Sequence, residues 1–147
     1  MNSQETVQAL MDSVQSGDFA KAKTFLSDDF RFKGLVRRPI SGKTWLKMGT
    51  SLLMAFTGLN YNFKVDSAKG DIVNTTSQMS GDNRGAIDLT GLGMGVISAT
   101  HKKFSTAREK NKITVRDQKV SSWVVEPTEG AGLQEILGQL GVKLPVK

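Results

Sequence analysis

Two carboxylates stand among apolar residues in the sequence and are candidates for acid–base chemistry. Asp88 lies in the segment AIDLTGL, and Glu126 ends the segment SWVVE. Apolar surroundings raise the pKa of a carboxyl group, which can then move a proton next to a substrate carbonyl. Asp88 is out of phase with Ile87 and Leu89, however, so it faces either a pocket or solvent. Glu126 stands either at a pocket mouth or exposed before Pro127. Asp88 and Glu126 are the candidate catalytic residues.

Chemistry of this kind also needs a hydrogen-bond donor that stabilises a developing enolate. Tyr61 is the only tyrosine of the chain, and it shares the alternation phase of Phe63. Its hydroxyl either sits at the edge of the core or donates to a ligand. Tyr61 and Phe63 are therefore candidate ligand-binding residues.

The composition argues against several other kinds of site. The chain has no cysteine and one histidine, which leaves no thiolate nucleophile, no disulfide and no histidine-rich metal site. The glycines of GLGMG at 91–95 have the wrong spacing for a phosphate or dinucleotide loop, and no strand–loop–helix unit surrounds them. We therefore expect no metal and no cofactor.

The net charge of +6 raises the question of nucleic acid. The basic residues are spread along alternating segments, and no zinc-finger or RNA-binding motif is present, so the pattern favours solvated strand faces over nucleic-acid binding. No apolar run approaches the roughly 18–20 residues that span a bilayer. The N-terminus MNSQETVQAL lacks a basic region followed by an apolar segment, so we expect a cytoplasmic protein without a secretory signal.

The central element of the chain is the stretch 41–65, SGKTWLKMGTSLLMAFTGLNYNFKV. Its first half predicts an amphipathic helix with an N-cap at Ser41 and a left-handed stop at Gly58. Its second half alternates apolar and polar residues from Tyr61 to Val65, which predicts a half-buried strand. The helix presents an apolar stripe of Trp45, Met48, Leu52 and Phe56. We expect this stripe both to pack the core and to line a ligand pocket.

Helices come first in the chain and strands follow. Segments 4–16 and 18–26 have helical periodicity, and Asp18 can cap the second of them. Strands alternate with turns after residue 65, with breaks expected at 69–71 and 81–83, a resumed strand at 85–90 and final strands up to residue 125. A short amphipathic helix follows at 133–140. This order predicts one α+β domain over 1–147, with helices on one face of a curved antiparallel sheet.

Four segments resemble the nuclear transport factor 2-like superfamily and, within it, the SnoaL-like polyketide cyclase branch, which is related to the ketosteroid isomerases. They are GDFAKAKTFLSDDFRFKG, SGKTWLKMGTSLLMAFTGLNYNFKV, VRDQKVSSWVV and LQEILGQLGVKLP, at 17–34, 41–65, 115–125 and 133–145. The resemblance implies a cone-shaped antiparallel sheet with three N-terminal helices on its concave face and a short C-terminal helix. It also implies an interior pocket and a homodimer formed through the sheet.

The chain departs from that family at its polar positions. The family's histidine motif is replaced by SGDNRG at 80–85, so Asp82 and Asn83 either face the ligand or form a bulge, and Asn83 joins the candidate ligand-binding residues. The single histidine, His101, falls in a predicted turn. The acid–base aspartate of the cyclases has no clean match in REKNKITV at 108–115, where Glu109 or Asn111 stands nearest.

Two functions are consistent with these residues. The first is a small-molecule-binding domain that holds a hydrophobic compound in an apolar pocket. The second is a cofactor-independent cyclase or isomerase that uses a pocket carboxylate as general acid and base on a hydrophobic, polyketide-like carbonyl compound. A carboxylate inside the pocket, with a hydrogen-bond donor beside it, would favour the enzyme.

Overall fold

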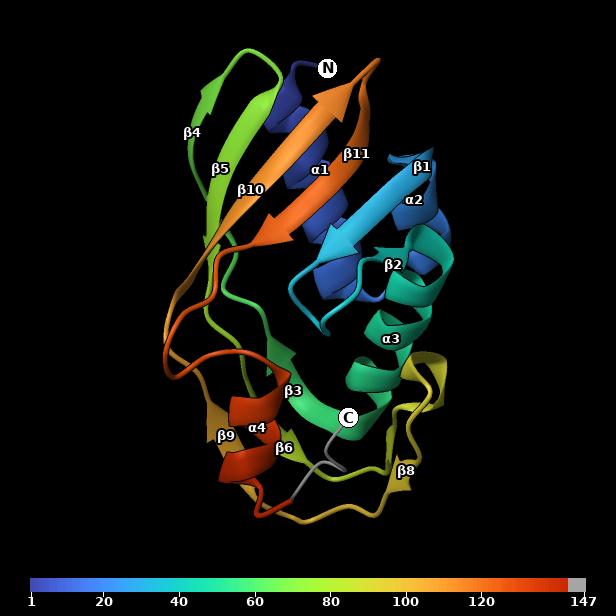
Figure 1. Ribbon diagram of the computed structural model, residues 1–147, viewed down its shortest axis with the longest axis vertical. Helices are drawn as coiled ribbons and strands as arrows, with labels where there is room; N and C mark the ends of the chain where they lie inside the picture. The colour runs from blue at the N-terminus through green and yellow to red at the C-terminus, as the bar shows by residue number, and fades with distance from the viewer. Residues whose placement is uncertain (143–147) are drawn as a thin grey trace.

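The computed structural model describes residues 1–142, which form four α-helices, one short 3-10 helix and eleven strands (Figure 1). The helices are α1 Ser3–Ser16, α2 Phe19–Thr24, α3 Gly42–Ala55, η1 Thr90–Leu92 and α4 Leu133–Gln139. The strands are β1 Leu26–Lys33, β2 Ile40–Ser41, β3 Phe56–Asn60, β4 Lys64–Lys69, β5 Ile72–Ser77, β6 Ser80–Asn83, β7 Ile87–Asp88, β8 Val96–Ile97, β9 Lys103–Ser105, β10 Glu109–Arg116 and β11 Lys119–Val125.

Six strands form the main sheet in the order β2-β1-β11-β10-β5-β4. All neighbouring pairs are antiparallel except β1 and β11, which run parallel. Smaller sheets of order β3-β6-β9 and β7-β8 continue the structure beyond one end of the main sheet (Figure 1). The result is the expected α+β architecture with a curved, unclosed sheet.

The helices cover one face of the main sheet. α1 lies behind β10 and β11 in Figure 1 and packs against β4, β5, β10 and β11. α3 packs against β1, β3 and α2. The predicted caps are confirmed: the Asp18 side chain accepts from Lys21 N, and the Ser41 side chain accepts from Thr44 N. α4 packs against β9 at the far end of the molecule.

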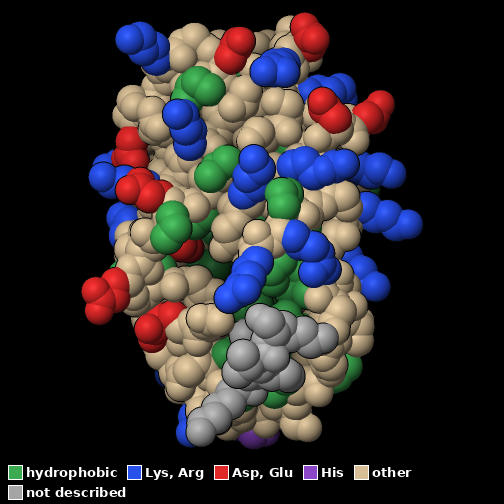
Figure 2. Space-filling model, in the orientation of Figure 1, with side chains coloured by type: hydrophobic (Ala, Val, Ile, Leu, Met, Phe, Trp, Pro, Cys, Tyr) green, Lys and Arg blue, Asp and Glu red, His purple; other side chains and the backbone are tan. Residues whose placement is uncertain are grey.

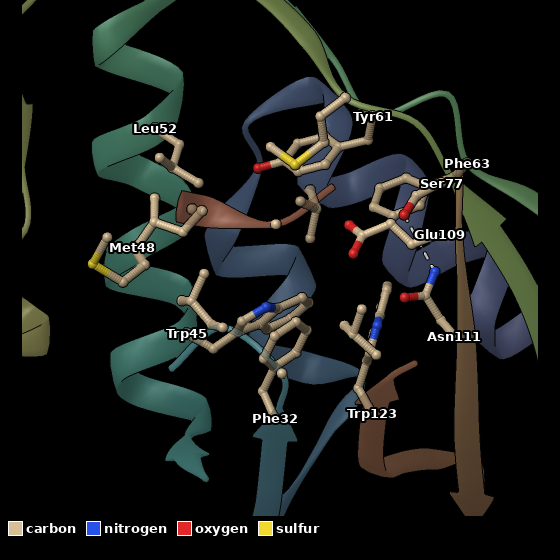
Figure 3. Close-up of a pocket in the computed structure, with 18 of the residues that line it drawn as sticks. Phe32, Trp45, Met48, Leu52, Tyr61, Phe63, Ser77, Glu109, Asn111 and Trp123 are labelled. Atoms are coloured by element: carbon tan, nitrogen blue, oxygen red, sulfur yellow. Dashed lines mark hydrogen bonds between the residues drawn. The ribbon is translucent and has the colours of Figure 1, made fainter. Parts of the chain in front are cut away.

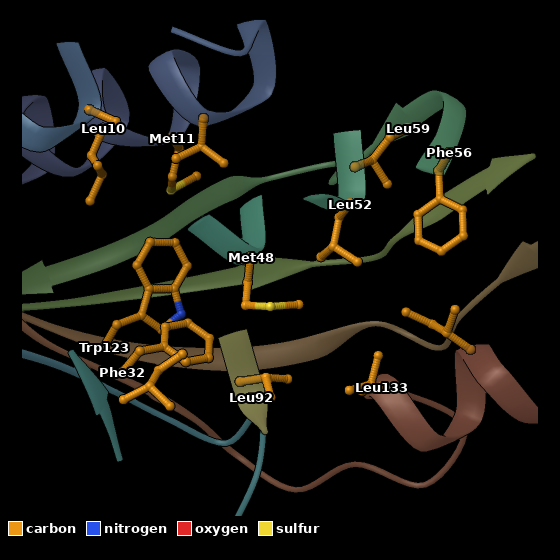
Figure 4. Packing of buried hydrophobic residues seen from close by; sticks show 14 of the residues in the cluster. Leu10, Met11, Phe32, Met48, Leu52, Phe56, Leu59, Leu92, Trp123 and Leu133 are labelled. Atoms are coloured by element: carbon orange, nitrogen blue, oxygen red, sulfur yellow. The ribbon is translucent and has the colours of Figure 1, made fainter. Parts of the chain in front are cut away.

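The core lies between this helical layer and the inner face of the sheet (Figure 4). Side chains of α1, including Leu10 and Met11, are fully buried against it. The same cluster continues through Met48 and Leu52 of α3 toward Leu133 of α4. One continuous core therefore joins the helices, the main sheet and the small sheet β3-β6-β9.

The helix that was predicted to stop at Gly58 ends earlier in the structure. The helix ends at Ala55, because the Ala55 carbonyl accepts hydrogen bonds from the backbone N–H groups of residues 84 and 85. Gly58 is left-handed as expected, with φ of 66°, but it lies within β3, where the pairing with β6 shifts register. The chain is already extended there, so Gly58 forms a bulge rather than a helix stop.

Residues 61–63 are not the strand that their alternation predicts. The Gln15 side chain of α1 donates to Leu59 O and accepts from Tyr61 N, both at 2.8 Å. Asn62 has φ of 45°, and its amide donates to Gln78 O at 2.8 Å. These long-range side-chain bonds replace a strand ladder, so the chain turns before β4 begins.

Two further predictions in the second half differ from the structure. Residues 81–83, predicted as a break, lie in β6, which pairs with both β3 and β9. The strand predicted at 85–90 shrinks to the two residues of β7, and η1 follows it. The end of the predicted motif LQEILGQLGVKLP, at 143–145, lies outside the described residues. No helix within residues 1–142 is long and apolar enough to cross a membrane.

Candidate functional site

A cavity of about 100 Å³ lies between α3 and the inner face of the main sheet. Figure 3 shows α3 on one side of it and β10 on the other, with side chains of both elements pointing into the space between them. The residues that line it are Val14, Phe19, Phe32, Gly34, Leu35, Trp45, Leu46, Met48, Gly49, Leu52, Tyr61, Phe63, Ser77, Met79, Glu109, Asn111, Trp123, Val125, Gly132, Leu133 and Ile136. Most of these residues are apolar.

Aromatic rings form one end of the cavity. Trp45 of α3 lies 5.3 Å from Trp123 and 5.6 Å from Phe32, measured between ring centroids. Phe63 meets Trp123 edge-on at 5.8 Å, and Tyr61 stacks on Phe63 at 4.9 Å. Such contacts fix the rings relative to each other. A flat apolar ligand would therefore meet a preformed aromatic wall.

The sheet changes from apolar to polar along the cavity. One row across the strands joins Phe32, Trp123, Ile113 and Val73, which are all apolar. The next row contains Asn111 on β10, and the row after that pairs Glu109 with Ser77. Residues two apart on a strand share a face, so Glu109 and Asn111 both point inward. The cavity therefore has an apolar helix wall opposite a polar strip of Ser77, Glu109 and Asn111.

Glu109 is the ionisable carboxylate of this strip. Its carboxylate points into the cavity in Figure 3, and it forms no ion pair or side-chain hydrogen bond with any described residue. Burial raises the pKa of the Glu109 carboxyl. Beside it, the Asn111 amide donates to the Ser77 hydroxyl at 3.3 Å. An unpaired carboxyl in apolar surroundings is the arrangement that suits proton transfer.

Two hydrogen-bond donors accompany this carboxylate. Trp123 is 2% exposed, and its indole Nε1–H has no partner among the described residues. Buried N–H groups are nearly always paired, so an unpaired one at a cavity wall is available to a ligand. Tyr61, which belongs to the same aromatic wall, supplies a hydroxyl, and burial raises the pKa of that hydroxyl, so it stays protonated. Both groups can donate to a carbonyl oxygen.

A wider groove of about 680 Å³ adjoins the cavity. It runs between the loop after β1 and the segment after β11. The two spaces share Gly34, Leu35, Glu109, Val125, Gly132 and Leu133. Glu109 and Val125 therefore stand at the neck that joins the cavity to the groove.

Five of the predicted ligand-binding residues line the cavity, namely Trp45, Met48, Leu52, Tyr61 and Phe63. Phe56 does not, because α3 ends before it and the residue packs edge-on against Phe104 at 4.8 Å. Asn83 lies elsewhere as well. Its amide donates to Ala55 O and Gly85 O, and its carbonyl accepts from Thr100, so its polar atoms are used in holding loops together.

The two predicted catalytic carboxylates do not line the cavity. Asp88 accepts hydrogen bonds from Thr90 Oγ1 at 2.6 Å and from Thr90 N at 2.9 Å. These bonds lower the pKa of the Asp88 carboxyl. Glu126 is exposed, directly after the end of β11. The alternation of Asp88 against Ile87 and Leu89 left a pocket and solvent open; both neighbours are fully buried, and Asp88 takes the outward position.

Glu109, which sequence reasoning named only as a neighbour of the expected aspartate, is the carboxylate that the fold brings into the cavity. The signal that could have found it is the alternation of buried and exposed residues on β10, once the inward phase of Ile113 is known.

His101 is exposed in a left-handed position, as expected of a turn. Within residues 1–142, no group of three or more His, Asp or Glu side chains is arranged to hold a metal ion.

The sequence matches no family model and no curated protein. The structure, in contrast, is similar to solved structures that carry the description "putative polyketide cyclase". The protein of this description from Xanthomonas campestris pv. campestris is 16% identical, with a TM-score of 0.70, and the match covers 94% of this chain and 96% of that chain. IdmH from Streptomyces antibioticus is 19% identical, with a TM-score of 0.69 and coverage of 97% and 100%.

A third such structure, from Jannaschia sp. CCS1, carries the description "putative SnoaL-like polyketide cyclase". It is 18% identical with a TM-score of 0.65, and the match covers 84% of this chain and 83% of that chain. Identities this low establish the fold alone. The chain therefore has the fold of these structures, the nuclear transport factor 2-like fold that the resemblance in the sequence implies.

Proposed function

We propose that this protein binds an apolar small molecule in the cavity between α3 and the main sheet. The observation that carries the proposal is the wall itself: aromatic and aliphatic side chains enclose the space, and a polar strip lies on one side only. Small-molecule sites have this composition, with a few polar groups that orient the ligand. The similarity to the cyclase structures supports the same use of the fold, which hosts both binding and catalysis.

The proposal is tested with N-phenylnaphthylamine, a neutral apolar fluorophore. The only two tryptophans, Trp45 and Trp123, both line the cavity, so a bound probe should quench their emission by energy transfer. The test variant is Val125→Phe, which narrows the neck. Its matched control is Val124→Phe, the adjacent residue on the outer face of β11.

We expect saturable quenching in the wild type, at least about fivefold weaker binding in Val125→Phe, and wild-type binding in Val124→Phe. Thermal unfolding of both variants checks that they remain folded. Absence of saturable quenching, or equal loss in both variants, would contradict binding in this cavity.

A second candidate function is proton transfer on a bound carbonyl compound, with Glu109 as general acid and base. The specific observation in its favour is the unpaired Glu109 carboxyl in a cavity that also presents the free indole N–H of Trp123. Glu109 would take a proton from the carbon next to the carbonyl and return it, while Trp123 or Tyr61 donates to the enolate oxygen.

Exchange of the α-hydrogens of β-tetralone in D₂O, followed by NMR, tests this second function. Catalysed exchange should fall by at least about a hundredfold in Glu109→Gln and stay at the wild-type level in Glu126→Gln, which changes an exposed carboxylate. Exchange by the wild type at the buffer rate would leave binding as the function of the cavity.

We also propose a homodimer formed through the outer face of the main sheet, as the resemblance to the cyclase branch implies. This face lies away from α1 and presents the outward residues of β1, β10 and β11. The cavity opens within one chain, so the proposed dimer supplies support to the sheet rather than residues to the site.

A further inference from the structure

The groove next to the cavity carries two arginines at its outer rim. Arg37 and Arg38 lie in the loop between β1 and β2, and both line the groove. Both are exposed, and neither forms a salt bridge with any residue of the described chain. The remaining walls are mainly apolar, from residues Leu35, Val36, Leu92, Met94, Val125, Pro127 and Leu133.

The loop that holds these arginines is anchored at both ends. Gly34 has φ of 117°, and a side chain there would meet Val125 Cβ at 2.6 Å, so the loop starts in close contact with β11. At its other end Ile40 is buried and pairs with Phe32. The anchored loop therefore keeps Arg37 and Arg38 beside the groove. Val125 lines both this groove and the cavity.

Charge is divided along the path from groove to cavity. The acidic side chain on the combined lining is Glu109, at the neck, and the basic ones are Arg37 and Arg38, at the rim. An anion placed near Glu109 would face like charge in a desolvated site, whereas one at the rim would face two guanidinium groups. Guanidinium groups bind planar and tetrahedral anions through paired N–H donors.

We propose that the ligand is an amphipathic organic anion, whose apolar rings enter the cavity and whose anionic group binds Arg37 and Arg38 in the groove. This inference rests on the proposed binding function and adds the chemical class and orientation of the ligand. The apolar groove walls accommodate the part of the molecule between its two ends. The neutral end then meets Glu109, and the charged end stays near solvent.

The test compares two probes that differ by one group. Anilinonaphthalene sulfonate is N-phenylnaphthylamine with an added sulfonate, so the pair separates the apolar from the anionic contribution. The test variant is R37Q/R38Q. The control variant is K110Q/K112Q, which removes the same charge from exposed positions on β10 that line neither space.

We expect the wild type to bind the sulfonate at least about tenfold more tightly than the neutral probe, from quenching of tryptophan emission. R37Q/R38Q should abolish this preference and leave the affinity for the neutral probe unchanged. K110Q/K112Q should change either affinity by less than about twofold.

Equal affinities for the two probes, or equal loss of sulfonate binding in both variants, would overturn the inference and leave the proposed function standing. Failure of both probes to bind would overturn the proposed function together with the inference. Arg-dependent binding of the sulfonate without any binding of the neutral probe would confine the site to the groove, which overturns the orientation proposed here.

Discussion

Glu109 differs from the exposed carboxylates of the chain in what surrounds it. It lies in the cavity wall, and burial raises its pKa. The folded protein therefore holds this proton more tightly than the unfolded chain does. The resulting stabilisation is complete below the ordinary Glu pKa and is lost as pH rises through the raised pKa.

Glutamine cannot ionise, so Glu109→Gln should escape this loss. We expect the variant to be more stable than the wild type at about pH 8 and to match it near pH 4, from urea unfolding across that range. Glu126→Gln, at an exposed site, should show no such trend. A stability difference for Glu109→Gln that is constant with pH would mean that the carboxyl titrates normally.

Asn83 illustrates a polar residue whose hydrogen bonds are made within the protein. It is fully buried and bonds to residues 55, 85 and 100. We expect Asn83→Ala to lower the free energy of unfolding by about 2–4 kcal/mol, because the change leaves buried groups unpaired. Affinity for N-phenylnaphthylamine, measured below the unfolding transition, should stay at the wild-type value. Lost affinity with unchanged stability would instead make Asn83 a ligand contact.

Helix α3 and the turn at 61–63 differ in how far the local sequence specifies them. The start of helix α3 and its cap at Ser41 follow from residues within one turn, so the local pattern predicted them, whereas the expected end at Gly58 was wrong. The turn at 61–63 depends on Gln15, which is far away in sequence, and local alternation predicted a strand there. Tertiary hydrogen bonds of this kind leave no periodic signal.

The close approach of α2 and α3 gives a prediction at the level of elements. Gly49 lies within α3 and lines the cavity, and a side chain there would meet the Phe19 ring at 2.8 Å. Alanine improves helix propensity by about 1 kcal/mol, but overpacking of this kind costs about 1–3 kcal/mol. We therefore expect Gly49→Ala to destabilise the protein by up to about 2 kcal/mol in urea unfolding.

The control is Gly138→Ala in α4, where an added side chain meets nothing within 4 Å. That variant should be stabilised by up to about 1 kcal/mol. Combining Phe19→Leu with Gly49→Ala should restore much of the lost free energy of unfolding, because the smaller side chain makes room for the added methyl group. If the two glycine variants have equal stability, the helices are not in tight contact at Gly49.

The site as a whole could be predicted only in part, because it depends on strand register. The apolar wall of α3 follows from helical periodicity, which groups Trp45, Met48 and Leu52 on one face, and all three line the cavity. Glu109 enters the cavity because β10 pairs with β5 and β11 in one particular register. A shift of one residue would bring Lys110 inward instead. Ile113 and Val115 mark the inward phase of β10, but the place of Glu109 beside the cavity depends on strands that are distant in the sequence.

The outer face of the main sheet determines how two whole molecules can meet. Lys33 and Lys112 flank Val124 across three neighbouring strands, and Lys110 lies two residues further along β10. Figure 2 shows Lys and Arg side chains spread over this face, with hydrophobic side chains between them. A two-fold dimer places the same patch on both partners, so these charges repel across the interface while the apolar groups attract.

We therefore expect the proposed dimer to be weak at low salt and to tighten as salt rises, because salt screens the repulsion. Sedimentation velocity at about 50 mM and 500 mM NaCl measures the dissociation constant, which should fall by at least about fivefold at the higher salt.

Lys112→Glu places opposite charges across the interface and should tighten the dimer at low salt. Lys21→Glu makes the same charge change on α2, away from this face, and should leave association unchanged. A dimer that weakens with salt, or that responds equally to both variants, would have to form through another surface.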